Sequence, residues 1–375
     1  MAWSLPKYSR SRVDAAAKVL MKVASLRPDD VVRVPSGEWT EELDIVNDWR
    51  SSHTFPLEAV RQDLEVRAKK ITPNALIAQR LKRLPSILGK LVENRERYMT
   101  LTQMQDIGGC RAIMPSLADV RSLVANYQHS LPGQVLMKTD DYIARPKEDG
   151  YRSVHLAIRY QTGEASYSKF NGHRVEIQVR TILQHMWATA AEMLFIFGGV
   201  PIRSSQRFVP AHRKSEEEIR LWRRFFNLMS DAMAGLEDGQ HPPPEVRSEL
   251  GSLVAAVNGR SAFWAWSHVE GWAIGSRSRL PGSVSDLGDA AYFLLELHPD
   301  EMGVTVNGFG QKDSEAAFRA YAEAEKRAQG LIGTNVVLVS VDSINQLREA
   351  YPNYYGDAEG FLNILDLFSR PVSSQ

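Results

Sequence analysis

Two segments of the chain alternate between apolar and polar residues, and this pattern constrains the fold more than any other feature. In VEIQVR (residues 175–180), three apolar residues share one face of a strand, and a glutamate, a glutamine and an arginine share the other. In YRSVHLAIRY (residues 151–160), Tyr151, Ser153 and His155 share one face, and apolar residues share the other. The apolar faces predict a buried core. The polar faces are either solvated surface or the floor of a site that handles charge.

Composition leaves the broad class open and excludes several kinds of site. The 375 residues are 43% hydrophobic and 24% charged, which is typical of a globular protein with room for two domains. Lys+Arg and Asp+Glu both number 45, so any basic surface must be local. The single cysteine excludes a disulfide and a cysteine-rich zinc site. Neither a long apolar run nor a signal-peptide core is found, so we expect a cytoplasmic protein without a membrane partner.

The order of expected elements predicts an α+β fold. Residues 9–27 and 38–105 are predicted to be helical, because apolar residues recur every three or four positions. Strands are predicted at residues 110–114, 135–138, 151–160, 174–180, 271–275, 291–298, 303–309 and 335–341. We therefore expect a mixed sheet flanked by helices, and a second, smaller α/β domain after the prolines at 242–244. The predicted domains are residues 1–245 and 260–375.

A basic block lies between residues 61 and 100, with ten basic and four acidic residues. Such an excess in a neutral protein suits a polyphosphate or a nucleic-acid backbone, although a solvated helix face gives the same pattern. Downstream, QDIGGCR places Asp106 before a strand and Arg111 on it, and the glycines allow close backbone approach. Asp106 and Glu176 together could hold Mg²⁺, which takes one or two carboxylates. The alternative is a turn followed by an ordinary surface arginine.

Four motifs occur in a specific order: RAKK at 67–70, QDIGGCR at 105–111, DYIARPKEDGYRSVH at 141–155 and VEIQVRTILQH at 175–185. Their order resembles the synthetase domain of the RelA/SpoT family across residues 60–195. The resemblance implies that residues 1–245 form an ATP-dependent pyrophosphokinase. Such a domain transfers the β,γ-pyrophosphate of ATP to a nucleotide 3′-hydroxyl and releases AMP. It also implies that the polar strand faces line a site.

The resemblance implies three groups of site residues. The catalytic residues would be Asp106, Arg111, Tyr151 and Glu176, and the two carboxylates would ligate Mg²⁺. The ATP-binding residues would be Arg67, Lys69, Lys70 and Lys82. The acceptor-binding residues would be Lys147, Tyr151, His155, Gln178, Arg180 and His185, with Tyr151 stacked on the acceptor's base.

Two departures from the family pattern bear on the activity. Alarmone synthetases usually carry a lysine directly before DYI, whereas this chain has Asp140. The lost positive charge weighs against a phosphorylated guanosine acceptor. The chain also lacks a His-Asp dipeptide, which the hydrolase domain of long family members carries. We therefore expect it to synthesise its product and not to degrade it.

The segment NVVLVSVDSINQLREAYPNYYGD resembles the C-terminal part of fused toxin–antitoxin synthetases of the CapRel type. This implies that residues 260–375 are a regulatory domain, which covers the active site until a phage protein, such as a major capsid protein, releases it. The implied acceptor is the 3′-hydroxyl of the tRNA CCA end, so that translation stops in anti-phage defence. The alternative is a (p)ppGpp synthetase of the stringent response, with GTP or GDP as acceptor. A catalytically inactive sensor or RNA-binding module is disfavoured, because both candidate carboxylates are present.

Tyr351 and Tyr354 are the predicted regulatory residues. They lie three apart, so both rings can share one face of a helical turn. We expect them to fill the adenine site. The acidic tail, from residue 341 to 375, would dock on the Arg67–Lys70 block. Alternatively, they pack the last helix onto its own domain.

Overall fold

The computed structural model describes residues 3–25, 40–94, 99–129, 133–203, 214–267, 273–275, 283–284, 287–298, 303–328, 335–341, 343–355 and 357–369. The strands are β1 (Leu76–Leu81), β2 (Gly108–Met114), β3 (Gln134–Asp141), β4 (Val154–Tyr160), β5 (Arg174–Thr181), β6 (Ala273–Gly275), β7 (Tyr292–His298), β8 (Gly303–Phe309) and β9 (Asn335–Ser340). The helices are α1 (Arg10–Ser25), α2 (Thr40–Ser51), α3 (Thr54–Ile71), α4 (Leu84–Glu93), α5 (Leu117–His129), α6 (Ile182–Gly198), α7 (Glu216–Glu237), α8 (Pro244–Ala256), α9 (Gly259–Ser267), α10 (Ser314–Arg327), α11 (Ile344–Ala350) and α12 (Glu359–Ser369).

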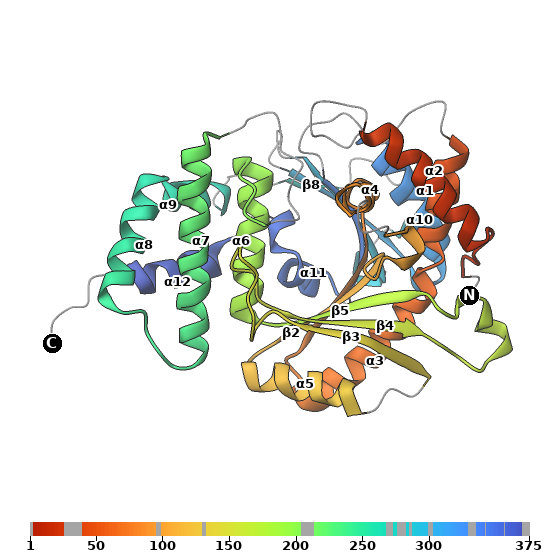
Figure 1. Cartoon of the computed structure of the whole chain (residues 1–375), viewed down its shortest axis with the longest axis horizontal. Helices are drawn as coiled ribbons and strands as arrows, with labels where there is room; N and C mark the ends of the chain where they lie inside the picture. Colours follow the sequence, from red (N-terminus) through yellow and green to blue (C-terminus); the bar gives the residue numbers. More distant parts are fainter. Residues whose placement is uncertain are drawn as a thin grey trace.

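The strands form one mixed sheet, in the order β3-β4-β5-β2-β1-β9-β7-β8-β6 (Figure 1). The β2–β5 and β6–β8 pairs are parallel, and the other neighbours are antiparallel. Helices flank this sheet on both faces, so the predicted α+β class is confirmed. The strands of the C-terminal segment continue the sheet of the N-terminal segment through the β1–β9 pair. That pair joins residues 79 and 80 to residues 340 and 339.

One predicted element is wrong. Residues 38–105 were expected to be helical, but β1 interrupts this region. The apolar residues of LIAQRL fit a helix and a strand equally well, because so short a run cannot separate the two periods. Antiparallel pairing with β2 on one side and β9 on the other decides in favour of a strand. The side chains of β1 therefore alternate between the two faces of the sheet.

The two faces of the sheet are covered differently. On the apolar face, α3, α5 and α10 pack on residues such as Leu156 and Ile177. On the polar face, α6 and α11 cover the strands, and Figure 1 shows α11 between the sheet and α6. A separate apolar core holds α6–α9 and α12 together. A further core joins α1, α2 and α4.

Helix α6 follows β5 without a connecting loop. The hydroxyl of Thr181 accepts a hydrogen bond from the backbone N–H of Gln184, and the Gln184 side chain bonds back to the Thr181 N–H. This capping box starts the helix. The helix ends at Gly199, whose φ of +67° lies in the left-handed region that favours glycine. The immediate start of α6 places His185 one turn into the helix, beside the end of β5.

None of the helices in the described ranges is both long enough and apolar enough to span a bilayer.

Candidate active site

Strand pairing lines up the polar residues in two neighbouring rows across the sheet. One row contains Arg80, Gly109 and Glu176 on β1, β2 and β5. The next row contains Arg111, Gln178, His155 and Asp140 on β2, β5, β4 and β3. Paired residues on adjacent strands point to the same side of a sheet. The polar faces predicted from sequence therefore form one continuous surface.

Two lysines hold the carboxylate of Asp106. Lys82 Nζ lies 2.9 Å from its Oδ2, and Lys90 Nζ lies 2.9 Å from its Oδ1. Burial alone would raise the pKa of Asp106, but the two ammonium groups outweigh it and hold this pKa well below its usual range. Asp106 is therefore an ionised carboxylate at the edge of the polar face.

The second carboxylate, Glu176, belongs to a chain of four linked side chains. Its Oε1 lies 3.2 Å from His155 Nδ1, and its Oε2 accepts a 2.7 Å hydrogen bond from Gln178 Nε2. On its other side, the His155 ring lies 3.0 Å from the Tyr151 hydroxyl. Burial raises the pKa of Glu176, but His155 outweighs it and the net shift is downward. The pKa of His155 is raised to about 9, since Tyr151 and Glu176 outweigh its burial.

Two guanidinium groups on the polar face are buried and only partly hydrogen-bonded. The Nε atoms of Arg111 and Arg180 are buried and have no hydrogen-bond partner among the described residues. Burial, followed by repulsion from Arg111, lowers the pKa of Arg180. Glu192 on α6 is a nearby counter-charge: its pKa is lowered because Arg80 and other arginines outweigh its burial. Buried guanidinium groups with a free N–H donor suit a polyanionic ligand.

The loop between β3 and β4 brings Lys147 to the same surface. Its Nζ lies 4.5 Å from the ring centroid of Tyr142 and 5.3 Å from that of Tyr151. Tyr151 itself is only 1% exposed, and its ring also lies near Trp187 on α6. The predicted stacking of a base on Tyr151 therefore requires this ring to become accessible.

The structure does not bring three of the predicted ATP-binding residues to this surface. Helix α3 lies on the apolar face, so the expected juxtaposition of Arg67 with the carboxylates is not observed. Arg67 is paired with Asp63 at 2.8 Å, and its guanidinium lies over the ring of Tyr127 at 4.8 Å. Lys70 lines a groove of about 290 Å³ on the same outer side of α3.

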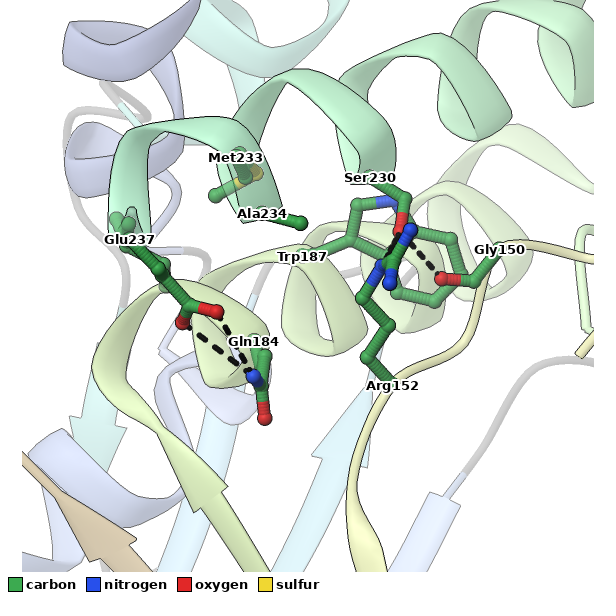
Figure 2. Close-up of a pocket in the computed structure, with 9 residues that line it drawn as sticks. Gly150, Arg152, Gln184, Trp187, Ser230, Met233, Ala234 and Glu237 are labelled. Carbon is green, nitrogen blue, oxygen red and sulfur yellow. Dashed lines mark hydrogen bonds between the residues drawn. The ribbon is translucent and has the colours of Figure 1, made fainter. Parts of the chain in front are cut away.

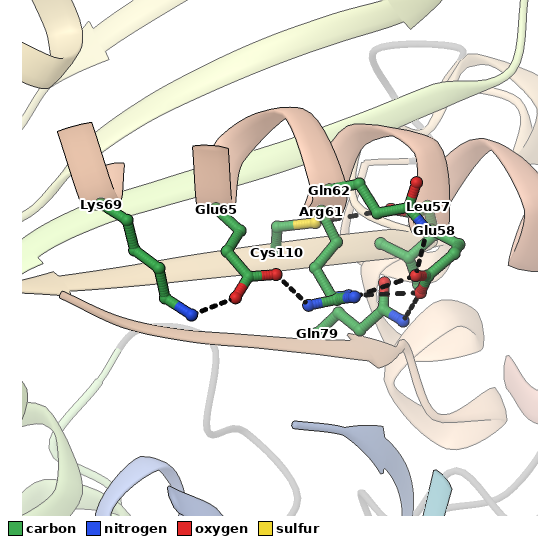
Figure 3. A network of polar contacts seen from close by, with 8 residues as sticks. All are labelled: Leu57, Glu58, Arg61, Gln62, Glu65, Lys69, Gln79 and Cys110. Carbon is green, nitrogen blue, oxygen red and sulfur yellow. Dashed lines mark hydrogen bonds and ion pairs between the residues drawn. The ribbon is translucent and has the colours of Figure 1, made fainter. Parts of the chain in front are cut away.

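Lys69 belongs to a polar ladder along α3, which Figure 3 shows. Its ammonium pairs with Glu65, which pairs with Arg61 at 3.0 Å. Arg61 pairs with Glu58, and Glu58 accepts a 2.8 Å hydrogen bond from Gln79 Nε2 of β1. The ladder fixes α3 to the back of the sheet. The alternative interpretation of this basic segment, a solvated helix face, therefore agrees with the contacts of α3.

Sequence reasoning missed three cations that the structure does place near the carboxylates. Arg80 lies in the row of Glu176, Lys90 holds Asp106, and Arg83 acts electrostatically on Glu192. All three belong to the basic block, but they follow the point where α3 ends. If LIAQRL is treated as a strand, Arg80 points to the face opposite to Gln79, and therefore to the polar face. Lys82 is the one predicted ATP-binding residue that reaches the polar face.

The C-terminal segment occupies the surface above Arg111 and His185. Arg111 Nη1 donates a 3.1 Å hydrogen bond to the carbonyl of Ala350, and His185 Nε2 donates one of 3.0 Å to the carbonyl of Glu349. Both carbonyls belong to the last turn of α11, where helix carbonyls lack partners within the helix. Arg180 in turn donates to Nδ1 of His185 at 2.6 Å. Backbone oxygens thus occupy positions beside cations that phosphate oxygens could take.

The two predicted regulatory tyrosines have different contacts. Tyr351 is 2% exposed; its hydroxyl donates to the carbonyl of Gln79 at 3.2 Å, and Arg111 lies 5.5 Å from its ring centroid. Tyr354 donates instead to Asn335 within the C-terminal segment, at 3.0 Å. Tyr351 therefore contacts the predicted site, while Tyr354 fits the alternative in which it packs its own segment.

The predicted docking of the acidic tail is wrong. Helix α12 packs against α7, α8 and α9, away from Arg67 and Lys70 on α3. The tail residue Asp366 forms an ion pair with Arg260 of α9. The apolar residues of α12, such as Phe361, dominate its placement by joining the helical core.

The two carboxylates fit a Mg²⁺ ion. Both Asp106 and Glu176 are ionised, and the charge of Asp106 acts on Glu176. No cluster of three or more histidine, cysteine, aspartate or glutamate residues that could hold a metal ion occurs in the described ranges. Two carboxylates suffice for Mg²⁺, because waters and phosphate oxygens complete its coordination. In the present arrangement lysines and His155 hold these carboxylates, so the ion would replace some of those contacts.

Comparisons with known proteins agree with this geometry. A sequence model described as "Region found in RelA / SpoT proteins" matches residues 79–195, from β1 to α6. The GTP pyrophosphokinase YjbM of Bacillus subtilis is 33% identical over 152 residues, which cover 40% of this chain and 69% of that protein. The GTP pyrophosphokinase YwaC of the same organism is 27% identical over 166 residues, covering 40% and 76%.

The chain also resembles solved structures, at lower similarity. The crystal structure of the small alarmone synthetase 1 from Bacillus subtilis, bound to its product pppGpp, has 24% identity and a TM-score of 0.40. It covers 54% of this chain and 98% of that chain. The similarity to YjbM and the family match over β1–α6 are decisive, and the residues that the family match covers include Asp106, which precedes β2, and Glu176 on β5. The chain belongs to the RelA/SpoT family of ATP-dependent pyrophosphokinases.

Proposed function

We propose that the polar face of the sheet binds ATP and transfers its β,γ-pyrophosphate to the 3′-hydroxyl of a nucleotide acceptor. The observation that carries this proposal is the charge arrangement: two ionised carboxylates, Asp106 and Glu176, lie at the same polar face as two buried arginines, whose Nε atoms have no hydrogen-bond partner among the described residues. Transfer of this kind asks a protein mainly for positioning and charge neutralisation. A solvated strand face would not bury its cations.

In the proposed reaction the acceptor oxygen forms a bond to the β-phosphorus, the bond between that phosphorus and the oxygen bridging to the α-phosphorus breaks, and AMP leaves. Glu176 takes the proton of the attacking hydroxyl, since its carboxylate is ionised and His155 holds its orientation. Asp106 and Glu176 would hold Mg²⁺, which would neutralise phosphate charge when bound. Arg111 and Arg180 contribute the rest of that neutralisation.

The cations of β1 and α4 are the proposed ATP ligands. Lys82 and Lys90 already meet at Asp106, and Arg80 lies in the row of Glu176. They replace Arg67, Lys69 and Lys70 in this role, because an ATP molecule cannot contact both faces of the sheet at once. Lys147, Gln178 and His185 remain the proposed acceptor ligands, together with Tyr151 and His155.

Two acceptors are candidates, and different observations support them. A guanosine nucleotide is supported by the names of the relatives YjbM and YwaC, which are GTP pyrophosphokinases. The tRNA 3′ CCA end is supported by Asp140, which lies in the row of His155 and pairs with Lys138 at 2.8 Å. The pair places a carboxylate at this end of the surface, where the phosphates of a small nucleotide would favour a cation.

The proposed resting state is autoinhibited. The carbonyls of Glu349 and Ala350 use the donors of His185 and Arg111, and Tyr351 covers that arginine. Residues 260–375 are the proposed regulatory domain and residues 1–245 the proposed catalytic domain. A phage protein, such as a major capsid protein, would release the regulatory domain from the polar face by binding that domain in its undocked form. With tRNA as acceptor, release would stop translation in anti-phage defence, and both proposed substrates indicate a cytoplasmic enzyme.

The deciding experiment incubates the full-length protein with γ-³²P-ATP, Mg²⁺ and either GDP, GTP or deacylated tRNA. Wild-type protein is compared with the Tyr351→Ala variant, which removes the contacts of the C-terminal segment with Arg111 and Gln79. Glu176→Gln is the inactive control. Transfer of label to one acceptor class identifies the substrate. Absence of label on every acceptor with the loosened variant would contradict the proposed function.

A further inference from the structure

The loop that carries Lys147 and Tyr151 is held by a helix outside the region that the family match covers. That match ends at residue 195, within α6, whereas α7 spans Glu216–Glu237. Figure 2 shows α7 crossing directly over Gly150 and Arg152. Side chains of α7 bond to this loop and to the start of α6.

Two α7 side chains bond to backbone carbonyls of the loop. The hydroxyl of Ser230 donates to the carbonyl of Gly150 at 2.5 Å, and Nδ2 of Asn227 donates to the carbonyl of Glu148 at 3.2 Å. Ser230 is 2% exposed, so water does not compete freely for its hydroxyl. The loop adds its own turn, in which the Gly150 N–H donates to the carbonyl of Lys147 at 2.8 Å. One backbone hydrogen bond therefore links Lys147 to Gly150, the residue whose carbonyl Ser230 of α7 binds.

Gly150 shows how closely the helix and the loop approach each other. Its φ is +84°, in the left-handed region, and a Cβ there would lie 2.8 Å from Oδ1 of Asn227 and 3.2 Å from Cβ of Ser230. The loop backbone is thus pressed against α7, with no space for a side chain between them. Tyr151 follows directly, and its position is set by this contact.

Arg152 adds a second set of bonds on the other side of Tyr151. Its Nε donates to the Ser230 hydroxyl at 3.0 Å, and its Nη2 pairs with Oδ1 of Asp231 at 2.7 Å. Its Nη1 donates to the carbonyl of Ile143 at 3.3 Å, which ties the start of the loop to its end. Ser230 is therefore the shared partner of Gly150 and Arg152, the two neighbours of Tyr151.

The far end of α7 is anchored at the junction of β5 and α6. The carboxylate of Glu237 accepts a 3.0 Å hydrogen bond from Nε2 of Gln184 (Figure 2). It accepts another from the hydroxyl of Thr181. Thr181 and Gln184 are the capping residues of α6, and they lie between Arg180 and His185. One helix thus contacts both the loop with Tyr151 and the junction with Arg180.

These polar contacts are separate from the packing that holds α7 in place. Its apolar residues, such as Phe226 and Met229, fill the core shared with α6, α8 and α12. Removing the Ser230 hydroxyl leaves that core intact and removes only the bonds to the loop. Ser230 can therefore be tested without dismantling the helix.

We propose that α7 is a positioning element of the acceptor site, in which Ser230 sets the placement of the loop that carries Lys147 and Tyr151. Glu237 sets the junction that carries Arg180 and His185. This inference rests on the proposed function, because it assigns those four residues to the acceptor. ATP binding, which is assigned to β1 and α4, does not depend on these contacts.

The test compares Ser230→Ala with Ser252→Ala, in which a serine on exposed α8 loses a hydroxyl that bonds only to the carbonyl of Ser248. Both changes are made in the full chain, and again on the Tyr351→Ala background. Ser230→Ala is expected to raise the KM for the acceptor about tenfold, from the loss of two buried hydrogen bonds. The KM for ATP should match that of Ser252→Ala, whereas the thermal midpoint should fall slightly, because the two buried hydrogen bonds also stabilise the fold. An equal rise in both KM values, or no change in either, overturns the proposal.

Hydrogen exchange separates this inference from the proposed function. In Ser230→Ala, the amides of residues 147–151 should exchange at least several-fold faster than in wild type, while those of β5 are unchanged. If exchange in the loop is unaltered, α7 does not position it and the inference is refuted, whatever the activity. If the wild type and its loosened variant transfer no label to any acceptor, the proposed function fails, and faster exchange would still support the positioning of the loop.

Discussion

Replacing Tyr351 tests whether the C-terminal segment holds the enzyme in an inactive state. Its ring is 2% exposed, lies against Arg111, and its hydroxyl bonds to the backbone of β1 at 3.2 Å. Truncating a buried aromatic residue to alanine costs about 3 kcal/mol or more. These contacts join the C-terminal segment to the catalytic strands. We therefore expect most of the lost free energy to appear as weaker binding of that segment to the polar face. About 3 kcal/mol changes an equilibrium by roughly 100-fold.

A milder change gives a graded expectation. Tyr351→Phe keeps the ring and removes only the bond to Gln79, which is worth about 1 kcal/mol, or roughly a fivefold change. Tyr355→Phe is the matched control, because the buried Tyr355 hydroxyl has no hydrogen-bond partner among the described residues. The basal rate of transfer should therefore rise in the order Tyr355→Phe, Tyr351→Phe, Tyr351→Ala, with the first equal to wild type.

The assay measures initial rates of label transfer from γ-³²P-ATP without any trigger protein. Circular dichroism and the thermal midpoint check that each variant is folded. The reasoning is refuted if folded Tyr351→Ala is no more active than wild type while wild type itself turns over at a measurable rate. In that case the contacts of Tyr351 would serve stability alone, and the reaction chemistry would be unaffected.

Three further predictions concern the carboxylate site, a buried ion pair and a histidine cluster. Glu176→Gln should lower the transfer rate by roughly 100-fold or more, with an unchanged thermal midpoint, because the side chain lies on the polar face; more than a tenth of wild-type activity would contradict the assignment. Glu325→Gln should lower the free energy of unfolding by about 3–5 kcal/mol in denaturant titrations, because it leaves the fully buried Arg50 guanidinium without its 2.8 Å partner; a loss below about 1 kcal/mol would refute this. Burial lowers the pKa of His53 and lowers that of His173 to about 4, so the unfolded chain binds more protons, and stability should fall as pH drops from about 6.5 towards 4. His173→Gln should flatten this pH dependence of the thermal midpoint, and an unchanged slope would argue against it.

The alternation of residues in β4 and β5 was enough to predict two strands and the chemistry of their faces. Side-chain direction in a strand follows from the local backbone period, so the sequence alone placed Glu176 and Gln178 on one face of their strand and His155 on the polar face of its own strand. The pairing of β4 with β5 brings these two faces to the same side. The order of motifs likewise indicated the family. These features depend on residues close together in the chain, and the structure confirms them.

The distribution of the basic block could not be read from the sequence. Arg67 and Arg80 are only thirteen residues apart, yet they lie on opposite sides of the sheet. The short run around Arg80 fits both helical and strand periods, and pairing with β2 and β9 decides between them. Which cations meet Asp106 therefore depends on contacts between distant segments.

Only the tertiary structure decided what covers the polar face. The carbonyls that bond to Arg111 and His185 come from backbone more than 160 residues away, and a backbone carbonyl leaves no mark in the side-chain pattern. The same holds for Ser230, whose partner is the carbonyl of Gly150. The sequence determined the local period of the strands and the chemistry on each face. The pairing of β9 with β1 and the packing of α7 and α11 determined which of those residues act together, because burial and hydrogen bonding between distant segments have no local signature.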